Sequence, residues 1–420
     1  MAVDTPARIA VLGAGPIGLE AALYARYLGY DVDLYERGRV AENLLRWGHV
    51  RLFTPWRMNV SPLGVAALRA QDETWRPPPD DALLTAREFV DIYYRPLAHS
   101  DLLADSLRTD TNVTAIGRQG QLKGENVGSD ARIFADFRIL LRGTSGHELV
   151  ETADVVIDAT GAYGNHCWLG DGGIPAVGES AAAHDIEYGL PDVLGDERET
   201  YAGRHTLVIG AGYSAATSIV ALAALATESP GTRIVWAARR EPTDRDTGPI
   251  RLMPNDRLRE REQLARAANT LAQSAAIDFR PGTLVSAIER TDSNRLRVQL
   301  AGKHAGEIEV DRIIANVGYR PDNTLWSELQ VHECYATGGP MKLAAALARQ
   351  TSADCLDQAA AGAQALINPE PDFYVLGAKS YGRDSRFLLA AGLTQIRELF
   401  SIIGDRAELD LYGTMAPTES

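Results

Sequence analysis

The sequence predicts an α/β protein with two three-layer domains, each built on a parallel sheet, one of them inserted into the other. Two observations predict this organisation. A short apolar run, a glycine-rich turn and a helical pattern follow one another near the start of the chain, and the same succession returns after residue 205. The chain has 420 residues, the usual length of two or three domains, and its 45% hydrophobic and 23% charged residues are ordinary for a globular protein.

The first succession occupies residues 8–36. Residues 8–12 (RIAVL) are apolar, too short for a helix and end at a glycine, which predicts a buried strand. The turn G-A-G-P-I-G follows, then a helical pattern closed by Gly29, and then a second strand over residues 31–35. The residues of this unit that we expect to contact a ligand are Gly13, Gly15, Pro16, Gly18, Glu36 and Arg37.

The spacing of these residues is typical of a Rossmann-like dinucleotide site. Gly13 permits the tight turn, Gly15 lets the backbone approach a pyrophosphate, and Gly18 lets the helix pack closely on the strand. The amino terminus of the helix then faces the phosphates. Glu36 lies 18 residues after Gly18, where a carboxylate can accept both ribose hydroxyls of an adenosine. The alternative is a glycine-rich turn that binds nothing.

The second succession begins at residues 206–209 (TLVI) and runs into the turn G-A-G-Y-S-A. A long alanine-rich helix follows, and then a strand over residues 233–237. The turn residues that we expect to contact a second dinucleotide are Gly210, Gly212, Ser214 and Ala215.

The second unit differs from the first where its second strand ends. No acid stands there, and Arg239 and Arg240 follow instead. Loss of the carboxylate removes repulsion of a 2′-phosphate, and paired guanidinium donors can bind one, so this site predicts NADPH rather than NADH. A solvated arginine pair at a strand end is the alternative.

Shorter segments complete the domains. Residues 111–116 (TNVTAI) predict a strand whose backbone, around Val113, can meet an adenine. Residues 131–142 and 147–151 resemble an antiparallel meander. Further apolar runs end in turns at 154–161, 311–318 and 373–377, and the turn residues of interest are Thr160, Gly161 and Gly377.

Charge and cysteine content exclude several classes of function. The 42 Lys and Arg residues stand against 56 Asp and Glu residues, a net charge of −14, so we expect no nucleic-acid or membrane partner. Cys167, Cys334 and Cys355 form no C-x-x-C pair, and no Cys/His cluster has metal-ligand spacing. An odd, sparse set of cysteines suits the reducing cytosol. No stretch has the length of a membrane span or the pattern of a signal peptide, so we expect a cytoplasmic protein.

Together these motifs resemble the flavoproteins with two dinucleotide-binding domains, over nearly the whole chain. The resemblance implies FAD at the first glycine turn with Glu36, and NADPH at the second with Arg239 and Arg240. It also implies a discontinuous FAD domain over 1–200 and 311–420, with an NADPH domain inserted over 203–310.

Two branches of this superfamily compete. Disulfide reductases carry a redox cysteine pair, which this chain lacks. Flavin-containing and N-hydroxylating monooxygenases carry none, and residues 311–319 (DRIIANVGY) partly match the D-x-x-x-L/F-A-T-G-Y element of the latter. The resemblance therefore implies a monooxygenase that uses NADPH and dioxygen to oxygenate a soft heteroatom of a small molecule through a peroxyflavin. The alternatives are an NADPH-dependent reductase that passes electrons to a partner protein or small acceptor, and a non-catalytic flavin-binding sensor.

Residues 47–62 (WGHVRLFTPWRMNVSP) follow Glu36 where such monooxygenases send a loop across the flavin ring. We expect Trp47 and Trp56 to pack on the ring, Arg57 to offset reduced-flavin charge, and Asn59 to donate to the bound oxygen. The alternative is a surface loop whose tryptophans anchor two helices.

A cationic loop follows the run at 373–377 and contains Lys379, Arg383 and Arg386. Loops at the carboxyl ends of parallel strands face the ligand crevice, so Lys379 is expected to contact a flavin phosphate, NADPH or an anionic substrate. An ordinary cationic surface loop is the alternative.

Overall fold

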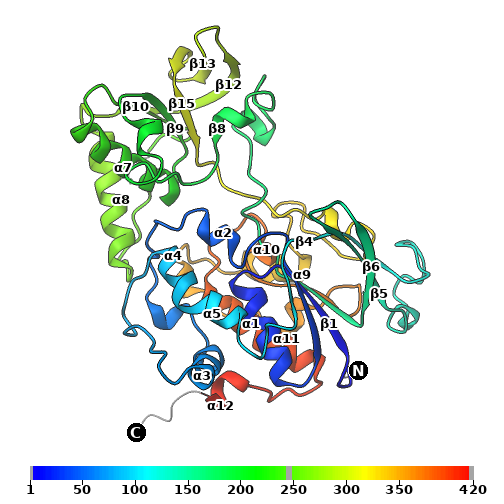
Figure 1. Cartoon of the computed structure of the whole chain (residues 1–420). Coiled ribbons are helices and arrows are strands. Elements are labelled where there is room, and N and C mark those ends of the chain that lie inside the picture. Colours follow the sequence, from blue (N-terminus) through cyan, green and yellow to red (C-terminus); the bar gives the residue numbers. More distant parts are fainter. Residues whose placement is uncertain (1–2, 243–247, 416–420) are drawn as a thin grey trace. The chain divides into compact units, whose positions relative to one another are not determined.

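The computed structural model describes residues 3–242 and 248–415 of the chain (Figure 1). The chain forms two compact units. Unit 1 consists of Met1–Asn165 and Arg320–Ser420, and unit 2 consists of His166–Tyr319. One continuous stretch is therefore inserted into a discontinuous unit.

The boundaries of unit 2 lie outside the expected range of 203–310. Strand β8 (Ile186–Glu187) pairs with β15 (Arg312–Ala315), and β15 pairs with β9 (His205–Ile209). Both β8 and β15 therefore belong to the sheet of unit 2, and they extend this unit beyond the expected limits at both ends.

A parallel sheet forms the middle of unit 1, with the strand order β16–β7–β1–β2–β3. Each neighbouring pair is parallel, so the carboxyl ends of these strands lie along one edge. The strands are β1 (Arg8–Leu12), β2 (Asp31–Tyr35), β3 (Leu107–Arg108), β7 (Val155–Asp158) and β16 (Phe373–Val375).

Helices and an antiparallel sheet complete unit 1. The antiparallel strands are β4 (Thr111–Arg118), β5 (Phe137–Gly143) and β6 (Glu148–Ala153). The helices are α1 (Pro16–Tyr27), α2 (Glu42–Leu45), α3 (Pro62–Gln71), α4 (Ala86–Phe89), α5 (Arg95–Ala98), α9 (Met341–Ala348), α10 (Ala378–Tyr381), α11 (Leu389–Ile403) and α12 (Leu411–Met415).

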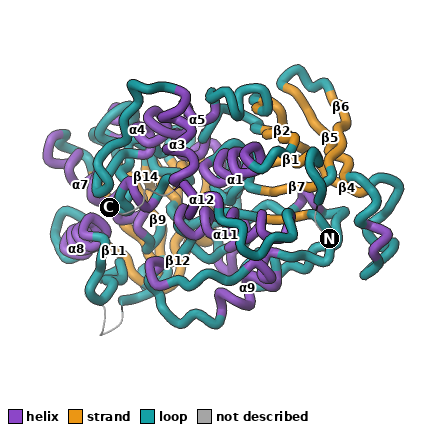
Figure 2. Tube along the Cα trace, turned by 90° about the horizontal axis from the view of Figure 1, so that it is seen from below, coloured by secondary structure: helices purple, strands orange, loops and turns teal. Residues whose placement is uncertain are grey.

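Alternate side chains of β1 face two different layers of unit 1. Ile9 and Val11 are buried in one core with α1 and α11, which pack against each other (Figure 2). Ala10 and Leu12 are buried in a second core with the β4–β5–β6 sheet. The apolar run over residues 9–12 of β1 suits this position, because both faces of the parallel sheet are covered.

A cluster of buried ionic side chains joins the two chain segments of unit 1. Glu370 accepts hydrogen bonds from Arg118 Nε and Arg132 Nη2, both at 2.8 Å. Burial raises the pKa of the Glu370 carboxyl, but its hydrogen bonds, from Arg132 first, outweigh burial and hold the pKa below its ordinary value. Removal of one partner from such a cluster leaves an uncompensated buried charge, so the cluster fastens the later segment to the earlier one.

Unit 2 repeats this plan with the parallel strand order β11–β10–β9–β15–β8. Val208 of β9 faces a core with α7 and α8, whereas Leu207 and Ile209 face a core with an antiparallel sheet. The further elements are α6 (Arg198–Tyr201), α7 (Tyr213–Glu228), β10 (Arg233–Ala238), α8 (Arg259–Ala272), β11 (Asp278–Pro281), β12 (Thr283–Arg290), β13 (Leu296–Gly302) and β14 (Gly306–Val310). The structure confirms the α/β class and the two Rossmann-like cores.

Within the described residues, no helix combines the length and the apolar character that crossing a membrane requires.

Candidate functional site

Four loops lie at the carboxyl edge of the parallel sheet in unit 1. They follow β1, β2, β7 and β16 and consist of residues 13–15, 36–37, 159–161 and 376–377; α1 and α10 begin directly after the first and the last of them. Ligands of open parallel sheets bind at this edge, outside the strand ends. The fold therefore brings the expected first glycine turn, Glu36, Thr160, Gly161, Gly377 and Lys379 to one edge.

The three glycines of the first turn meet different surroundings. Gly13 has a φ of +94°, and a Cβ there would lie 2.9 Å from the carbonyl oxygen of Ala159. A Cβ at Gly18 would lie 1.8 Å from the carbonyl oxygen of Gly13, so only glycine fits beneath α1. A Cβ at Gly15, which precedes Pro16 at the helix start, would meet nothing within 4 Å. The backbone at Gly15 is therefore open to a ligand.

Glu36 is buried beside this turn. Its Oε2 accepts the Ala14 N–H at 2.9 Å, and its Oε1 accepts the Gly38 N–H at 2.9 Å. Each carboxylate oxygen can accept more than one hydrogen bond, so these contacts orient the carboxylate and leave it capacity for ribose hydroxyls. Arg37 is exposed, with its guanidinium beside Gly164.

The start of β4 lies next to Glu36, because the Thr111 N–H donates to the Glu36 carbonyl oxygen at 2.9 Å. Val113 is half-buried against the core below, immediately before a bulge in the pairing of β4 with β5. This position is compatible with the expected adenine contact.

Lys379 is 2% exposed, which overturns the alternative of a cationic surface loop. Its Nζ donates to Asp158 Oδ2 at 2.6 Å and to Thr160 Oγ1 at 3.0 Å. Trp326 Nε1 donates to the same Asp158 oxygen at 2.8 Å, and Thr160 also donates to Asp158. Lys379 thus fixes the turn at Thr160 and Gly161 from within the core, where the sequence predicted a direct ligand contact.

Gly377 opens the loop that carries Lys379. It has a φ of +70°, and its N–H donates to Gln395 Oε1 at 2.9 Å. The Gly377 N–H is therefore engaged by α11, so a ligand contact at this residue would involve other backbone atoms.

The aromatic residues of the 47–62 loop belong to the core of unit 1. Trp56 is buried and packs edge-on against Phe89 and Tyr93. Trp47 is half-buried against the same core, and Arg57 is exposed. Trp56 therefore has no ring face left for a flavin, and the alternative of tryptophans that anchor helices describes this loop.

Asn59 is buried, and its amide is used by its own loop. Its Nδ2 donates to the carbonyl oxygens of Thr54 and Pro55, both at 3.0 Å, and its Oδ1 accepts the Thr54 hydroxyl at 2.9 Å. Both amide hydrogens are engaged, so the expected donation from Asn59 to bound oxygen has no support in this arrangement.

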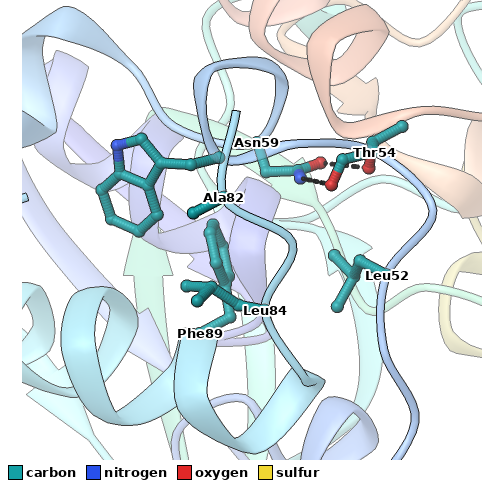
Figure 3. A pocket seen from close by; sticks show the side chains of 7 residues that line it. Leu52, Thr54, Asn59, Ala82, Leu84 and Phe89 are labelled. Carbon is teal, nitrogen blue, oxygen red and sulfur yellow. Dashed lines mark hydrogen bonds between the residues drawn. The ribbon is translucent and has the colours of Figure 1, made fainter. Parts of the chain in front are cut away.

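A small recess adjoins Asn59 and is lined mainly by apolar side chains, as Figure 3 shows. Its interior has no room for a water molecule, whereas ligand pockets measure roughly 300–1,000 Å³, so it does not form a substrate site. The lining residues are Leu52, Thr54, Trp56, Asn59, Ala82, Leu84 and Phe89.

Unit 2 repeats the turn of unit 1 at the end of β9. A Cβ at Gly210 would lie 2.3 Å from the Asn316 carbonyl oxygen, whereas a Cβ at Gly212 would meet nothing within 4 Å. Ser214 lies in the first turn of α7 and is half-buried, and Ala215 is fully buried. The backbone at Gly212 is thus open in the same way as that at Gly15.

Arg239 and Arg240 directly follow β10, the neighbour of β9, and both are exposed. They therefore lie at the carboxyl edge of the sheet, one strand away from the glycine turn. This is the place where the ribose of a bound dinucleotide is recognised in such folds.

Sequence reasoning missed the polar side chains that hold the two turns. In unit 2, Asn316 Oδ1 accepts the Ser218 hydroxyl at 2.9 Å, and Asn316 Nδ2 donates to the Gly189 carbonyl oxygen at 2.8 Å. In unit 1, Asp158 and Trp326 have the corresponding role. Asp158 directly precedes the A-T-G turn, so a charged residue at the end of an apolar strand was the available signal.

Residues 69–339, more than half of the chain, match the family model described as pyridine nucleotide-disulphide oxidoreductase. A comparison with curated proteins gave no match.

Solved structures of enzymes with different reactions share the fold. A bacillithiol disulfide reductase from Bacillus cereus has a TM-score of 0.66 at 16% identity, with 95% of this chain and 99% of that chain covered. A thioredoxin reductase from Lactococcus lactis has a TM-score of 0.58 at 16% identity, with 95% and 98% covered. A cadaverine monooxygenase from Erwinia amylovora, solved with bound FAD, has a TM-score of 0.63 at 14% identity, with 96% and 95% covered.

Proposed function

Because the chain belongs to the pyridine nucleotide-disulphide oxidoreductase family, we propose that it is an oxidoreductase that holds FAD in unit 1 and NADPH in unit 2. One observation carries the proposal. Two open glycine turns, at Gly15 and Gly212, each lie at the carboxyl edge of a separate parallel sheet. A carboxylate adjoins the first turn, and two guanidinium groups follow the strand beside the second.

The residues of unit 1 fit FAD. The open backbone at Gly15 gives a pyrophosphate room, and the start of α1 supplies N–H groups that no helical carbonyl satisfies. Glu36 would accept the ribose hydroxyls of the adenosine. When bound, FAD supplies the redox chemistry that couples NADPH oxidation to reduction of an acceptor.

We further propose that the acceptor is dioxygen and that a soft heteroatom, nitrogen or sulfur, of a small molecule is oxygenated. The cysteines support this choice over a disulfide reductase. None of Cys167, Cys334 and Cys355 stands in a C-x-x-C pair. Transfer of electrons through a dithiol therefore has no residues to use.

A second candidate is a reductase that passes electrons from the flavin directly to a small acceptor or a partner protein. The Asn59 amide favours this candidate. Both of its hydrogens are bonded within the 54–59 loop, and a monooxygenase needs a donor that holds oxygen at the flavin.

Gly15→Val tests the FAD assignment. Because a Cβ at Gly15 meets no protein atom, the variant should fold with the secondary structure of the wild type, as measured by circular dichroism. Its side chain would fill the space for the pyrophosphate, so the purified protein should lack the yellow flavin absorbance that the wild type shows. Stoichiometric FAD in this variant would refute the assignment.

Rapid mixing of the reduced protein with dioxygen separates the two candidate reactions. A monooxygenase should show a transient absorbance that belongs to neither the reduced nor the oxidised flavin, and an added amine or thioether should lower the yield of hydrogen peroxide per NADPH consumed. Direct return of the oxidised spectrum, together with fast reduction of an added quinone or dye, would establish the reductase.

A further inference from the structure

The strand order of unit 2 gives its coenzyme site two distinguishable sides. The turn at Gly210 and Gly212 follows β9, which lies between β10 and β15. Arg239 and Arg240 follow β10, so they mark one side of the turn. A dinucleotide that crosses such a turn places its two nucleosides on opposite sides. With the 2′-phosphate at the arginines, the nicotinamide half lies beyond the ends of β15 and β8.

The loops on this second side are tied to one another. Asn316, directly after β15, donates to the carbonyl oxygen of Gly189, two residues after β8. Tyr319 donates its hydroxyl proton to the Tyr188 carbonyl oxygen at 2.9 Å. The loops after β15 and β8 therefore form one bonded surface beside the glycine turn.

Three aromatic rings gather on this surface. His166 and Tyr188 are stacked, with ring centroids 3.5 Å apart and an interplanar angle of 13°. Trp168 stands edge-on to both, with centroids 4.8 Å from His166 and 6.5 Å from Tyr188. All three residues are half-buried, so the group is partly open to solvent. We call these residues the aromatic cluster.

The aromatic cluster is held from below by a buried carboxylate. Glu179 is fully buried and accepts the Tyr188 hydroxyl at 2.8 Å and the Ala176 N–H at 2.7 Å. It also accepts the Leu169 N–H, the residue after Trp168, at 2.9 Å. One buried anchor thus fixes the positions of two of the three cluster residues.

We infer that the aromatic cluster is the wall of the coenzyme site that receives the nicotinamide ring, and that the His166–Tyr188 stack supplies its contact surface. The inference rests on the proposed NADPH site of unit 2 and adds the residues that bind the other half of the coenzyme. Flat aromatic surfaces bind heteroaromatic rings by offset stacking or edge contacts, and a stack fixed by Glu179 offers such a surface without reordering.

Two ligands test the two sides separately, by calorimetry on the purified protein. NADP⁺ occupies both sides, whereas adenosine 2′,5′-bisphosphate occupies only the arginine side. His166→Ala and Tyr188→Ala should weaken NADP⁺ binding about threefold to tenfold, the worth of one aromatic contact. Binding of the bisphosphate should stay within about twofold of the wild type, and Tyr188→Phe, which keeps the ring, should restore most of the NADP⁺ affinity.

His205→Ala is the matched control. His205 opens β9 and therefore lies at the opposite, amino edge of the same sheet, so its loss should change neither affinity. Thermal unfolding of each variant shows whether unit 2 remains folded, and His166→Ala carries the test if Tyr188→Ala does not fold.

The inference is overturned if His166→Ala and Tyr188→Ala leave NADP⁺ binding unchanged, or if they weaken both ligands equally. A wild-type protein that binds neither ligand would instead overturn the coenzyme assignment of unit 2, and the inference with it. The two failures are distinct, because the second is visible before any variant is made.

Discussion

Unit 1 and unit 2 place the same G-A-G turn at the end of the middle strand of a parallel sheet, but they surround it with opposite charges. In unit 1, Glu36 is buried against the turn and accepts the Ala14 N–H. In unit 2, Arg239 and Arg240 follow the neighbouring strand and are exposed. Under the proposed function, the turn would hold phosphates in both units, and the residues after the second strand would distinguish FAD from NADPH.

The units differ again at the third position of the turn. A Cβ at Gly18 would overlap the Gly13 carbonyl oxygen, whereas Ala215 carries a Cβ in the corresponding place and is fully buried. They also differ beneath the turn, where unit 1 buries Asp158 with Lys379 and unit 2 buries Ala315. One motif is therefore supported by two different interiors.

Lys379→Met removes the buried cation of unit 1, and we expect it to lower stability more than any other variant. It leaves Asp158 buried without its cation, which should lower the free energy of unfolding by about 3–5 kcal/mol. Urea denaturation measures the change, and Lys342→Met, on the exposed face of α9, is the matched control. Asp158→Ala in the Lys379→Met background copies Ala315 of unit 2 and should recover part of the loss. Unchanged stability of Lys379→Met would refute the role of this ion pair.

Gly18→Ala tests the third position. Its Cβ would meet a backbone oxygen that cannot move without displacing β1, so we expect a loss of about 3 kcal/mol in urea denaturation. The reverse change in unit 2, Ala215→Gly, should cost only about 1 kcal/mol, the ordinary helix penalty of glycine. Equal losses at the two positions would show that the helices of both units approach their strands alike.

Arg239→Ala combined with Arg240→Ala tests the charge difference. Charge-assisted hydrogen bonds of roughly 1.5–3 kcal/mol predict a rise in the KM for NADPH on the order of tenfold to a hundredfold. The KM for NADH should change little, because NADH has no 2′-phosphate. Steady-state kinetics with both coenzymes measures this, and equal use of the two by the wild type would contradict it.

Glu20→Gln should change stability least among these variants, and it tests a difference between helices α1 and α7. Glu20 of α1 is buried and bonded to the Tyr93 hydroxyl at 2.5 Å, where α7 has Thr217. Burial, only partly offset by hydrogen bonds from Ser61 and Tyr93, raises the pKa of Glu20 above 4.5. The contribution of Glu20 to the free energy of unfolding is therefore fully present below pH 4.5, and it is lost as the pH rises through the raised pKa.

We expect Glu20→Gln to raise the free energy of unfolding at pH 8, because a neutral amide does not carry the cost of burying a charge. Its stability should also fall less than that of the wild type between pH 5 and pH 8. Parallel pH profiles of the two proteins would contradict the prediction.

The sequence predicted what depends on neighbours along the chain. The strand, turn and helix at residues 8–29 follow from apolar runs and glycines that lie next to one another, and the structure confirms them. The Lys379–Asp158 ion pair joins residues 221 positions apart, and no local pattern shows that Lys379 points inward. The limits of unit 2 were also missed. Strand β8 is only two residues long, and the sequence of β15 is that of any buried strand, so it does not show which sheet the strand joins.

The 47–62 loop shows how composition misleads. Tryptophan and asparagine suit a flavin pocket, but they suit a core and a tight loop equally well. Tertiary contacts decide between these uses. Phe89 and Tyr93 pack against Trp56, and the carbonyl groups of Thr54 and Pro55 accept hydrogen bonds from Asn59.

The discontinuity of unit 1 has a consequence for synthesis on the ribosome. Unit 2 is complete once residue 319 has emerged, whereas unit 1 awaits β16, Glu370 and Lys379, which follow unit 2 in the sequence. Domains fold as units while the chain is made. The inserted unit therefore has all its strands before unit 1 does, and the amino-terminal segment stays without its partner strand and two buried counter-charges until residues 370–379 have been synthesised.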